Sequence, residues 1–467
     1  MRSNKIFHFF FAFLVCQLAF GQDNSPDPNT LSIDEFISVV RAYHPVFRQS
    51  DLQYESSLES LKAARGGFDP ALQMSLDEKQ FDQKEYFRYS GANLKIPTWY
   101  GLDFQAGLAQ NDGERIFPEL TPGRSQYLGL KMPLLQGLAY DKRRNAVQQA
   151  KQMVLFSNEE RISMRNQTLF AGIKAYYDWK LWVEQKKLAD SLATANRLRF
   201  EMVRSGFFLG ERPAIDTVEA LSQWQQYQII QIEAEQKLLE ARFELSNFLW
   251  LENGNYYDIP ERVSPPENEV NLPVLLSLTQ CLDQAVLHPK WKQAGIKLKS
   301  LDLEKRLKFQ MLLPTADLGF QSLSADQRLF PAQVFPQDNF KLGIDLQIPL
   351  FFRQGRGEYN RAKIKIREQK LEMDILNAGL RNEIRKYHND AAQFAVQVNI
   401  QTEATENYRQ LYAAELERFS TGESSLFLIN QRENKYLESR QKLLYLQAKS
   451  AVSAYGVSYA MGSLARE

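Results

Sequence analysis

A helical segment bounded by two prolines occurs twice in this chain and constrains its fold more than any other feature. The copies span residues 44–70 and 288–314, and both begin with a His-Pro pair and end at a proline 25 residues after the first. Proline does not continue a helix, and the residues after each second proline alternate between apolar and polar. A duplicated joint from helix to strand predicts two similar halves.

The amino terminus has the composition of a secretory signal sequence. Two basic residues precede an apolar run over residues 7–20, and small residues suited to cleavage follow. We therefore expect residues 1–21 to be a signal peptide. The run is too short to span a membrane comfortably, and bulky Val15 before Cys16 disfavours a lipoprotein signal.

Composition argues against several function classes. The 57 Lys and Arg residues balance 56 Asp and Glu residues, so no basic field for nucleic acid is expected. The two cysteines cannot form a disulfide framework or a Cys-rich metal site. His44, His288 and His388 are widely scattered, and metal ligation by His44 or His288 is less favoured than a place at a helix end before proline.

Enzymatic motifs are also missing from the sequence. It contains no Gly-x-Ser-x-Gly, no His-Glu-x-x-His and no phosphate-binding glycine loop. The many carboxylates leave a glycosidase-like pair open, although no element presents one. We expect no catalytic residue, no metal and no cofactor.

Alternation of apolar and polar residues predicts strands with one apolar face in both halves. Four such segments occur in the first half, at about 70–133, and two in the second half, at about 314–349. The predicted junctions between helix and strand are Pro70, Pro133, Pro314 and Pro349.

Two proline-poor stretches predict long helical hairpins, at about 138–252 and about 355–462. One helix from about Tyr140 to Met202 would be on the order of 90 Å long, which exceeds an ordinary globular helix. The predicted division is a first repeat at 22–252, a linker at 253–273 and a second repeat at 274–467.

An apolar strand face needs a partner, which is a second sheet in a soluble sandwich and lipid in a membrane. The polar residues on the opposite faces suit water, and the segments are about long enough to cross a bilayer as tilted strands. So few strands cannot close a useful barrel alone, and lipid does not tolerate an open edge. The sequence therefore predicts a barrel shared between chains and continued by a helical tube.

With these features the chain resembles the TolC-like outer membrane efflux proteins over nearly its whole mature length. The resemblance rests on the two His-Pro openings, the prolines that enter strands, and the strand exits at 132–137 and 348–355. It implies an α+β membrane protein, a homotrimer whose shared β-barrel is continued by a long α-helical periplasmic barrel, with two repeats per chain. It also implies an outer membrane exit duct of a tripartite efflux or type I secretion system. The implied partners are a periplasmic adaptor and an inner-membrane transporter.

The hairpin tips of this family, which meet the adaptor, typically carry a glycine and an aspartate six residues later. Gly210 and Asp216 match that pattern, whereas Gly422 is followed by Leu428. The resemblance predicts these tip residues: Gly206, Gly210, Asp216, Gly422 and, as a substitute acid, Glu423.

A second departure is the four strand segments of the first half, where the family usually has two. Either the barrel is larger or one hairpin lies outside it. Two other classes stay open, a periplasmic coiled-coil adaptor and a structural envelope protein. Adaptors usually have a single hairpin, and alternating strands oppose a purely structural coiled coil.

Overall fold

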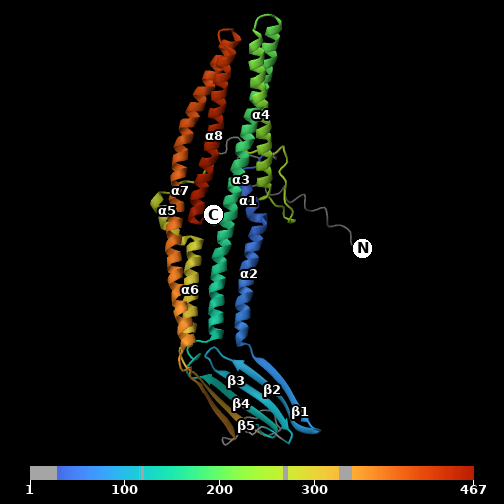
Figure 1. Cartoon of the computed structure of the whole chain (residues 1–467), viewed down its shortest axis with the longest axis vertical. Coiled ribbons are helices and arrows are strands. Elements are labelled where there is room, and N and C mark those ends of the chain that lie inside the picture. Colours follow the sequence, from blue (N-terminus) through green and yellow to red (C-terminus); the bar gives the residue numbers. More distant parts are fainter. Residues whose placement is uncertain (1–28, 115, 117–119, 267–271, 326–338, 467) are drawn as a thin grey trace, which may run out of the picture.

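Long helices run along most of the molecule, and one β-sheet lies at one end (Figure 1). The computed structural model describes residues 29–114, 116, 120–266, 272–325 and 339–466. The predicted signal peptide lies outside these residues, as does most of the predicted loop between the two strands of the second half.

Eight α-helices are present in the described chain. They are α1 (Ile33–Tyr43), α2 (Pro45–Arg65), α3 (Lys142–Phe208), α4 (Ala214–Ser246), α5 (Leu278–Gln284), α6 (Pro289–Gln310), α7 (Arg353–Ser420) and α8 (Leu426–Met461). The pairs α3–α4 and α7–α8 form two hairpins whose tips lie at the end opposite the sheet, and α2, α3, α6 and α7 reach the sheet (Figure 1).

The long helices differ from expectation at their ends. Helix α3 has 67 residues, about 100 Å, and continues six residues past the predicted Met202. Helix α4 ends at Ser246, short of the predicted hairpin end at about 252, because the chain folds back there: the Tyr257 amide donates to the Leu249 carbonyl at 2.9 Å. Pro213 is the N-cap of α4, one residue before its first turn.

The repeated His-Pro pairs begin α2 and α6. His44 Nδ1 accepts a hydrogen bond from the Val46 amide at 3.2 Å, and His288 Nδ1 accepts one from the Lys290 amide at 3.1 Å. The following proline occupies the first helical position, where a missing N–H costs nothing. Both histidines are helix caps, and the described residues contain no group of three or more His, Cys, Asp and Glu side chains able to hold a metal.

The six strands form one antiparallel sheet in the order β1-β2-β3-β4-β5-β6. Their bounds are β1 (Ala71–Phe81), β2 (Lys84–Pro97), β3 (Asp103–Asp112), β4 (Gly123–Pro133), β5 (Thr315–Ser324) and β6 (Phe340–Gln347). The halves join where β4 pairs with β5, with Leu130 opposite Phe320. All four strands of the first half therefore belong to the same sheet as the two of the second.

Side chains divide the sheet into an apolar and a polar face. Residues opposite each other share a face, as Leu72 does with Leu94 and Leu318 with Met132. The apolar side chains of both edge strands are exposed, for example Met74 at 76 % and Ile344 at 64 %. An exposed apolar face of this extent is typical of an interaction surface.

The largest hydrophobic core lies far from the sheet, where α1, α3, α4 and α8 pack together. It contains the fully buried Phe36, Tyr176 and Trp179, and each such side chain contributes about 2 kcal/mol. Gly172 permits the close approach of α1, because a Cβ there would lie 3.1 Å from the Phe36 ring. The core therefore fixes the middle of the helical part.

The His288 cap makes stability depend on pH. Burial, and then the charges of Lys290 and Arg466, lower the pKa of His288 from its ordinary 6.5 to about 4. Between pH 6.5 and about pH 4 the His288 side chain is protonated in the unfolded chain and neutral in the folded chain. Its contribution to the free energy of unfolding is therefore complete above pH 6.5 and is lost as the pH falls towards 4. The loss is about 3 kcal/mol at most. We expect the melting temperature followed by circular dichroism to fall over this window.

His288→Asn should flatten that pH dependence, because asparagine caps a helix without titrating in this range. His288→Ala should flatten it too, and also cost about 1 kcal/mol at pH 7 through loss of the cap. An unchanged pH profile in both variants would contradict the assignment to His288.

Candidate functional site

The polar face of the sheet carries a chain of ion pairs beside the helices. Asp103 on β3 accepts from Arg143 at 2.9 Å and lies 3.2 Å from Lys95 on β2. Lys131 on β4 lies 3.3 Å from Asp317 on β5. These pairs tie neighbouring strands on a face that suits water.

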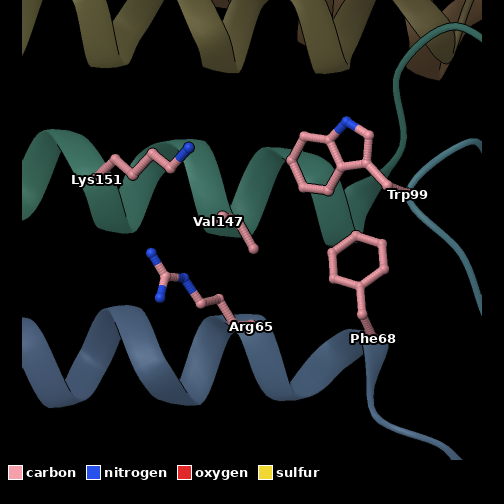
Figure 2. Close-up of a pocket in the computed structure, with 5 residues that line it drawn as sticks. All are labelled: Arg65, Phe68, Trp99, Val147 and Lys151. Atoms are coloured by element: carbon pink, nitrogen blue, oxygen red, sulfur yellow. The ribbon is translucent and has the colours of Figure 1, made fainter.

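Aromatic packing and two cations define a pocket at the joint between helices and sheet (Figure 2). The Phe68 and Trp99 ring centroids lie 5.2 Å apart, and Val147 of α3 is buried behind them. Arg65 and Lys151 complete the lining of a cavity of about 430 Å³. Trp99 packs on Phe68 and is 43 % exposed.

The four predicted junction prolines lie where helices meet the sheet. Two immediately precede β1 and β5, one is the last residue of β4, and one lies two residues beyond β6; they are Pro70, Pro314, Pro133 and Pro349.

Backbone hydrogen bonds join the exit of β4 to the entry of β5. The Leu134 amide donates to the Ala316 carbonyl at 2.6 Å, and the Gln136 amide donates to the Pro314 carbonyl at 3.2 Å. Gly137, at φ 93°, turns the chain towards α3. The exit motif of the first half is thus bonded to the joint of the second.

The first hairpin tip contains Gly206, Gly210 and Asp216. Gly210 has φ 77°, a left-handed conformation that favours glycine, and the Glu211 amide donates to the Gly206 carbonyl at 2.9 Å. Asp216 lies 3.6 Å from Arg212 in an ion pair.

The second tip turns at Gly422, with φ 80°, and the Glu423 amide donates to the Arg418 carbonyl at 2.9 Å. Glu423 is exposed. The two tips touch within one chain, because the Arg212 guanidinium lies 4.6 Å above the Phe419 ring. The structure therefore brings the two sets of predicted tip residues together, while their role towards a partner stays a prediction.

A buried ionic network near the tips was missed by sequence reasoning. Arg199 of α3 donates two hydrogen bonds to Glu433 of α8, at 2.7 and 3.2 Å. Glu433 is fully buried, and Tyr412 of α7 donates to it at 2.8 Å. Burial and the Glu433 charge raise the pKa of Tyr412, so its hydroxyl keeps the proton that it donates.

The network extends to the remaining long helix. Asn430 donates to Glu219 of α4 at 3.1 Å, and the Tyr227 hydroxyl of α4 donates to Asn434 at 3.1 Å. All four long helices are therefore linked in this region. The sequence signal is weak: charged Arg199 stands on the same stripe as apolar Val203, where a charge is unusual.

Within the described chain, no helix combines the length and the apolar character needed to cross a membrane. No protein-family model and no curated protein matches the sequence.

Solved structures do match, over nearly the whole chain. The CmeC outer membrane channel of Campylobacter jejuni is 13% identical, with a TM-score of 0.68 over 92% of this chain and 86% of that one. The outer membrane protein VceC of Vibrio cholerae is 11% identical, with a TM-score of 0.65 over 92% and 96%. The open MtrE outer membrane channel of Neisseria gonorrhoeae is 14% identical, with a TM-score of 0.66 over 92% and 89%.

These likenesses establish the fold. The chain has the fold of these outer membrane proteins, and the structural resemblance expected from the sequence motifs is confirmed.

Glu433→Ala should destabilise the protein strongly, because it leaves the Arg199 guanidinium buried without its partner. Breaking such a pair costs about 3–5 kcal/mol, so we expect a clear fall in the melting temperature of the helical circular dichroism signal.

The matched control is Glu438→Ala on the same helix, which removes an exposed ion pair with Lys435. Surface pairs contribute little, so this variant should melt like the parent protein. Equal effects of the two substitutions would contradict the importance assigned to the buried network.

Proposed function

We propose that this protein is the outer membrane exit duct of an export system, a passive channel with its helical part in the periplasm. The observation that carries the proposal is the sheet, which has an exposed apolar face, a polar face and two unpaired edges, and continues into helices about 100 Å long. In lipid the apolar face finds its solvent and the polar face lines water.

The unpaired edges require further copies of the chain. Backbone groups of β1 and β6 have no partner strand on their outer sides among the described elements. Lipid does not satisfy such groups, so the barrel closes only when a sheet edge of one copy meets a sheet edge of another. Resemblance to the TolC-like proteins favours three copies.

Exposed apolar residues on the long helices support the same assembly. Ile229 and Ile232 of α4 are 57 % and 65 % exposed, and Leu371 and Ile375 of α7 are 63 % and 74 % exposed. Contiguous exposed apolar patches mark interaction sites. Neighbouring copies around a helical tube would cover them, and a periplasmic adaptor would meet the tips.

The similar solved structures support the place of action. CmeC and MtrE are described as outer membrane channels, and VceC as an outer membrane protein. A duct of this kind performs no chemistry; cargo would reach it from an inner-membrane transporter through the adaptor. A periplasmic adaptor is the weaker assignment, because two hairpins joined to a six-stranded sheet exceed what a single-hairpin adaptor contains.

Substitutions on opposite faces of β6 should separate a membrane sheet from a soluble one. Ile344→Arg places a charge on the lipid side and should cost about 2–4 kcal/mol near the bilayer centre. Gly343→Arg places the same charge on the polar side, where the added side chain meets open space. We expect the first to lower the yield of membrane-inserted trimer severalfold and the second to preserve it.

Trimer is measured by light scattering in detergent, and conduction in a planar bilayer. The parent protein and Gly343→Arg should conduct ions. A water-soluble monomer extracted without detergent would overturn the duct proposal.

Gly422→Val should impair export while leaving trimer assembly intact. A β-branched residue at φ 80° strains the second tip by about 1–2 kcal/mol. Gly254→Val is the control, because Gly254 has φ 84° and equally open surroundings but lies in the linker. The readout is accumulation of a fluorescent efflux dye, or loss of secreted protein, in cells that carry only the variant. Equal export in both variants would remove Gly422 from the tip function.

A further inference from the structure

We propose that the barrel contains eighteen strands, six from each of three copies, with β6 of one copy hydrogen-bonded to β1 of the next. This inference rests on the proposed duct and adds the number of strands in its barrel. The alternative, with one hairpin outside the barrel, leaves four strands per copy and gives a narrower exit.

The additional hairpin is fully integrated in the sheet. Strand β1 pairs with β2 from Ala71 opposite Lys95 to Phe81 opposite Lys84, with one bulge between Lys79 and Gln80. Strand β2 pairs with β3 without interruption from Pro97 opposite Asp103 to Arg88 opposite Asp112. No break separates this hairpin from the strands that join the two halves, so β1 is the edge of the sheet.

The two edges match in direction and in face. Strand β1 leaves α2 and β6 enters α7 at the same end of the sheet, so the strands are antiparallel when copies lie side by side. Along β6 the even-numbered residues are apolar and the odd-numbered residues are polar or glycine, and residues 72–77 of β1 follow the same pattern. Antiparallel pairing with the faces aligned would place three apolar pairs side by side: Leu72 with Leu346, Met74 with Ile344, and Leu76 with Leu342.

Charge on the polar face supports the same neighbour. Asp77 lies six residues from the helix-side end of β1, and Lys341 lies six residues from the helix-side end of β6. Neither has an ion-pair partner among the residues that the structure describes. Opposite charges at one level on two free edges form a cross-strand pair once the copies meet.

The strand number sets the width of the exit. Barrel diameter grows roughly linearly with strand number, so eighteen strands give a barrel about 1.5-fold wider than twelve at equal tilt. Barrels of 16–18 strands leave an open aqueous channel. Cargo would then be selected by size in the helical tube and at its tips. The barrel itself would not restrict bulky hydrated cargo.

Crosslinking between copies tests the neighbour of β6. Ser75→Cys with Gly343→Cys places two thiols on the polar face of the two edges, and a bismaleimide with a span of about 8 Å tolerates a shift by one residue pair. Within one copy these positions are five strands apart, about 24 Å along the sheet. We expect dimer and trimer bands in denaturing gels of the membrane-embedded protein.

Gln105→Cys with Gly343→Cys is the matched alternative, because it links β3 of one copy to β6 of the next only in a twelve-stranded barrel. This pair should give no bands. The parent protein, whose Cys281 is buried, controls for background reaction. Circular dichroism confirms that each variant keeps the helical content of the parent.

Every outcome of the crosslinking and light-scattering measurements either supports or overturns the inference. Bands from the Ser75–Gly343 pair alone support eighteen strands. Bands from the Gln105–Gly343 pair overturn the inference and leave a narrower trimeric duct in place. A trimer by light scattering with bands from neither pair also overturns it, whereas a monomer in detergent removes the proposed duct itself.

Discussion

In the proposed duct the outer edges of β1 and β6 are the strongest constraint, because neither pairs with another strand among the described elements. A sheet edge in water is solvated, but an edge in lipid costs several kcal/mol for each unsatisfied group. The apolar face of the same strands, with Met74 and Ile344 exposed, favours leaving water. One chain cannot satisfy both demands in lipid, so the proposed barrel is complete only within an assembly of copies.

In the proposed duct the helix–sheet joint lies at the same change of surroundings. Helices α2 and α6 end at Arg65 and Gln310, and the prolines that follow them stand directly before β1 and β5, where helix cannot resume. The amides of Leu134 and Gln136 bond to the second joint, so the two halves enter the sheet as one unit. His44 and His288 cap the other ends of α2 and α6. Each half therefore has a cap and a later proline at the two ends of one helical segment of equal length.

Local patterns allowed most elements to be predicted, whereas long-range partners could not be. Period-two alternation located the strands, and missing prolines located the long helices, because both signals lie within a few turns of chain. Arg199 and Glu433 are 234 residues apart, and nothing near either residue indicates the other. The place of the first hairpin in the sheet stayed open for the same reason, because strand alternation specifies a face and not a neighbour. The end of α4 was misplaced because the fold-back at Leu249 depends on Tyr257, beyond the helix.

The backbones of the two tips turn alike, and an exposed glutamate follows the turning glycine in each, Glu211 after Gly210 and Glu423 after Gly422. Asp216 is engaged by Arg212, whose guanidinium also lies over Phe419 of the other hairpin. Asp216 therefore acts within the chain, where it holds the arginine that joins the hairpins, whereas Glu211 has no ion-pair partner among the described residues. Glu423 is exposed and has no ion-pair partner among the described residues. Leu428 stands where the family pattern places an acid, so Glu423, next to the glycine that forms the turn, stays the predicted substitute acid of the second tip.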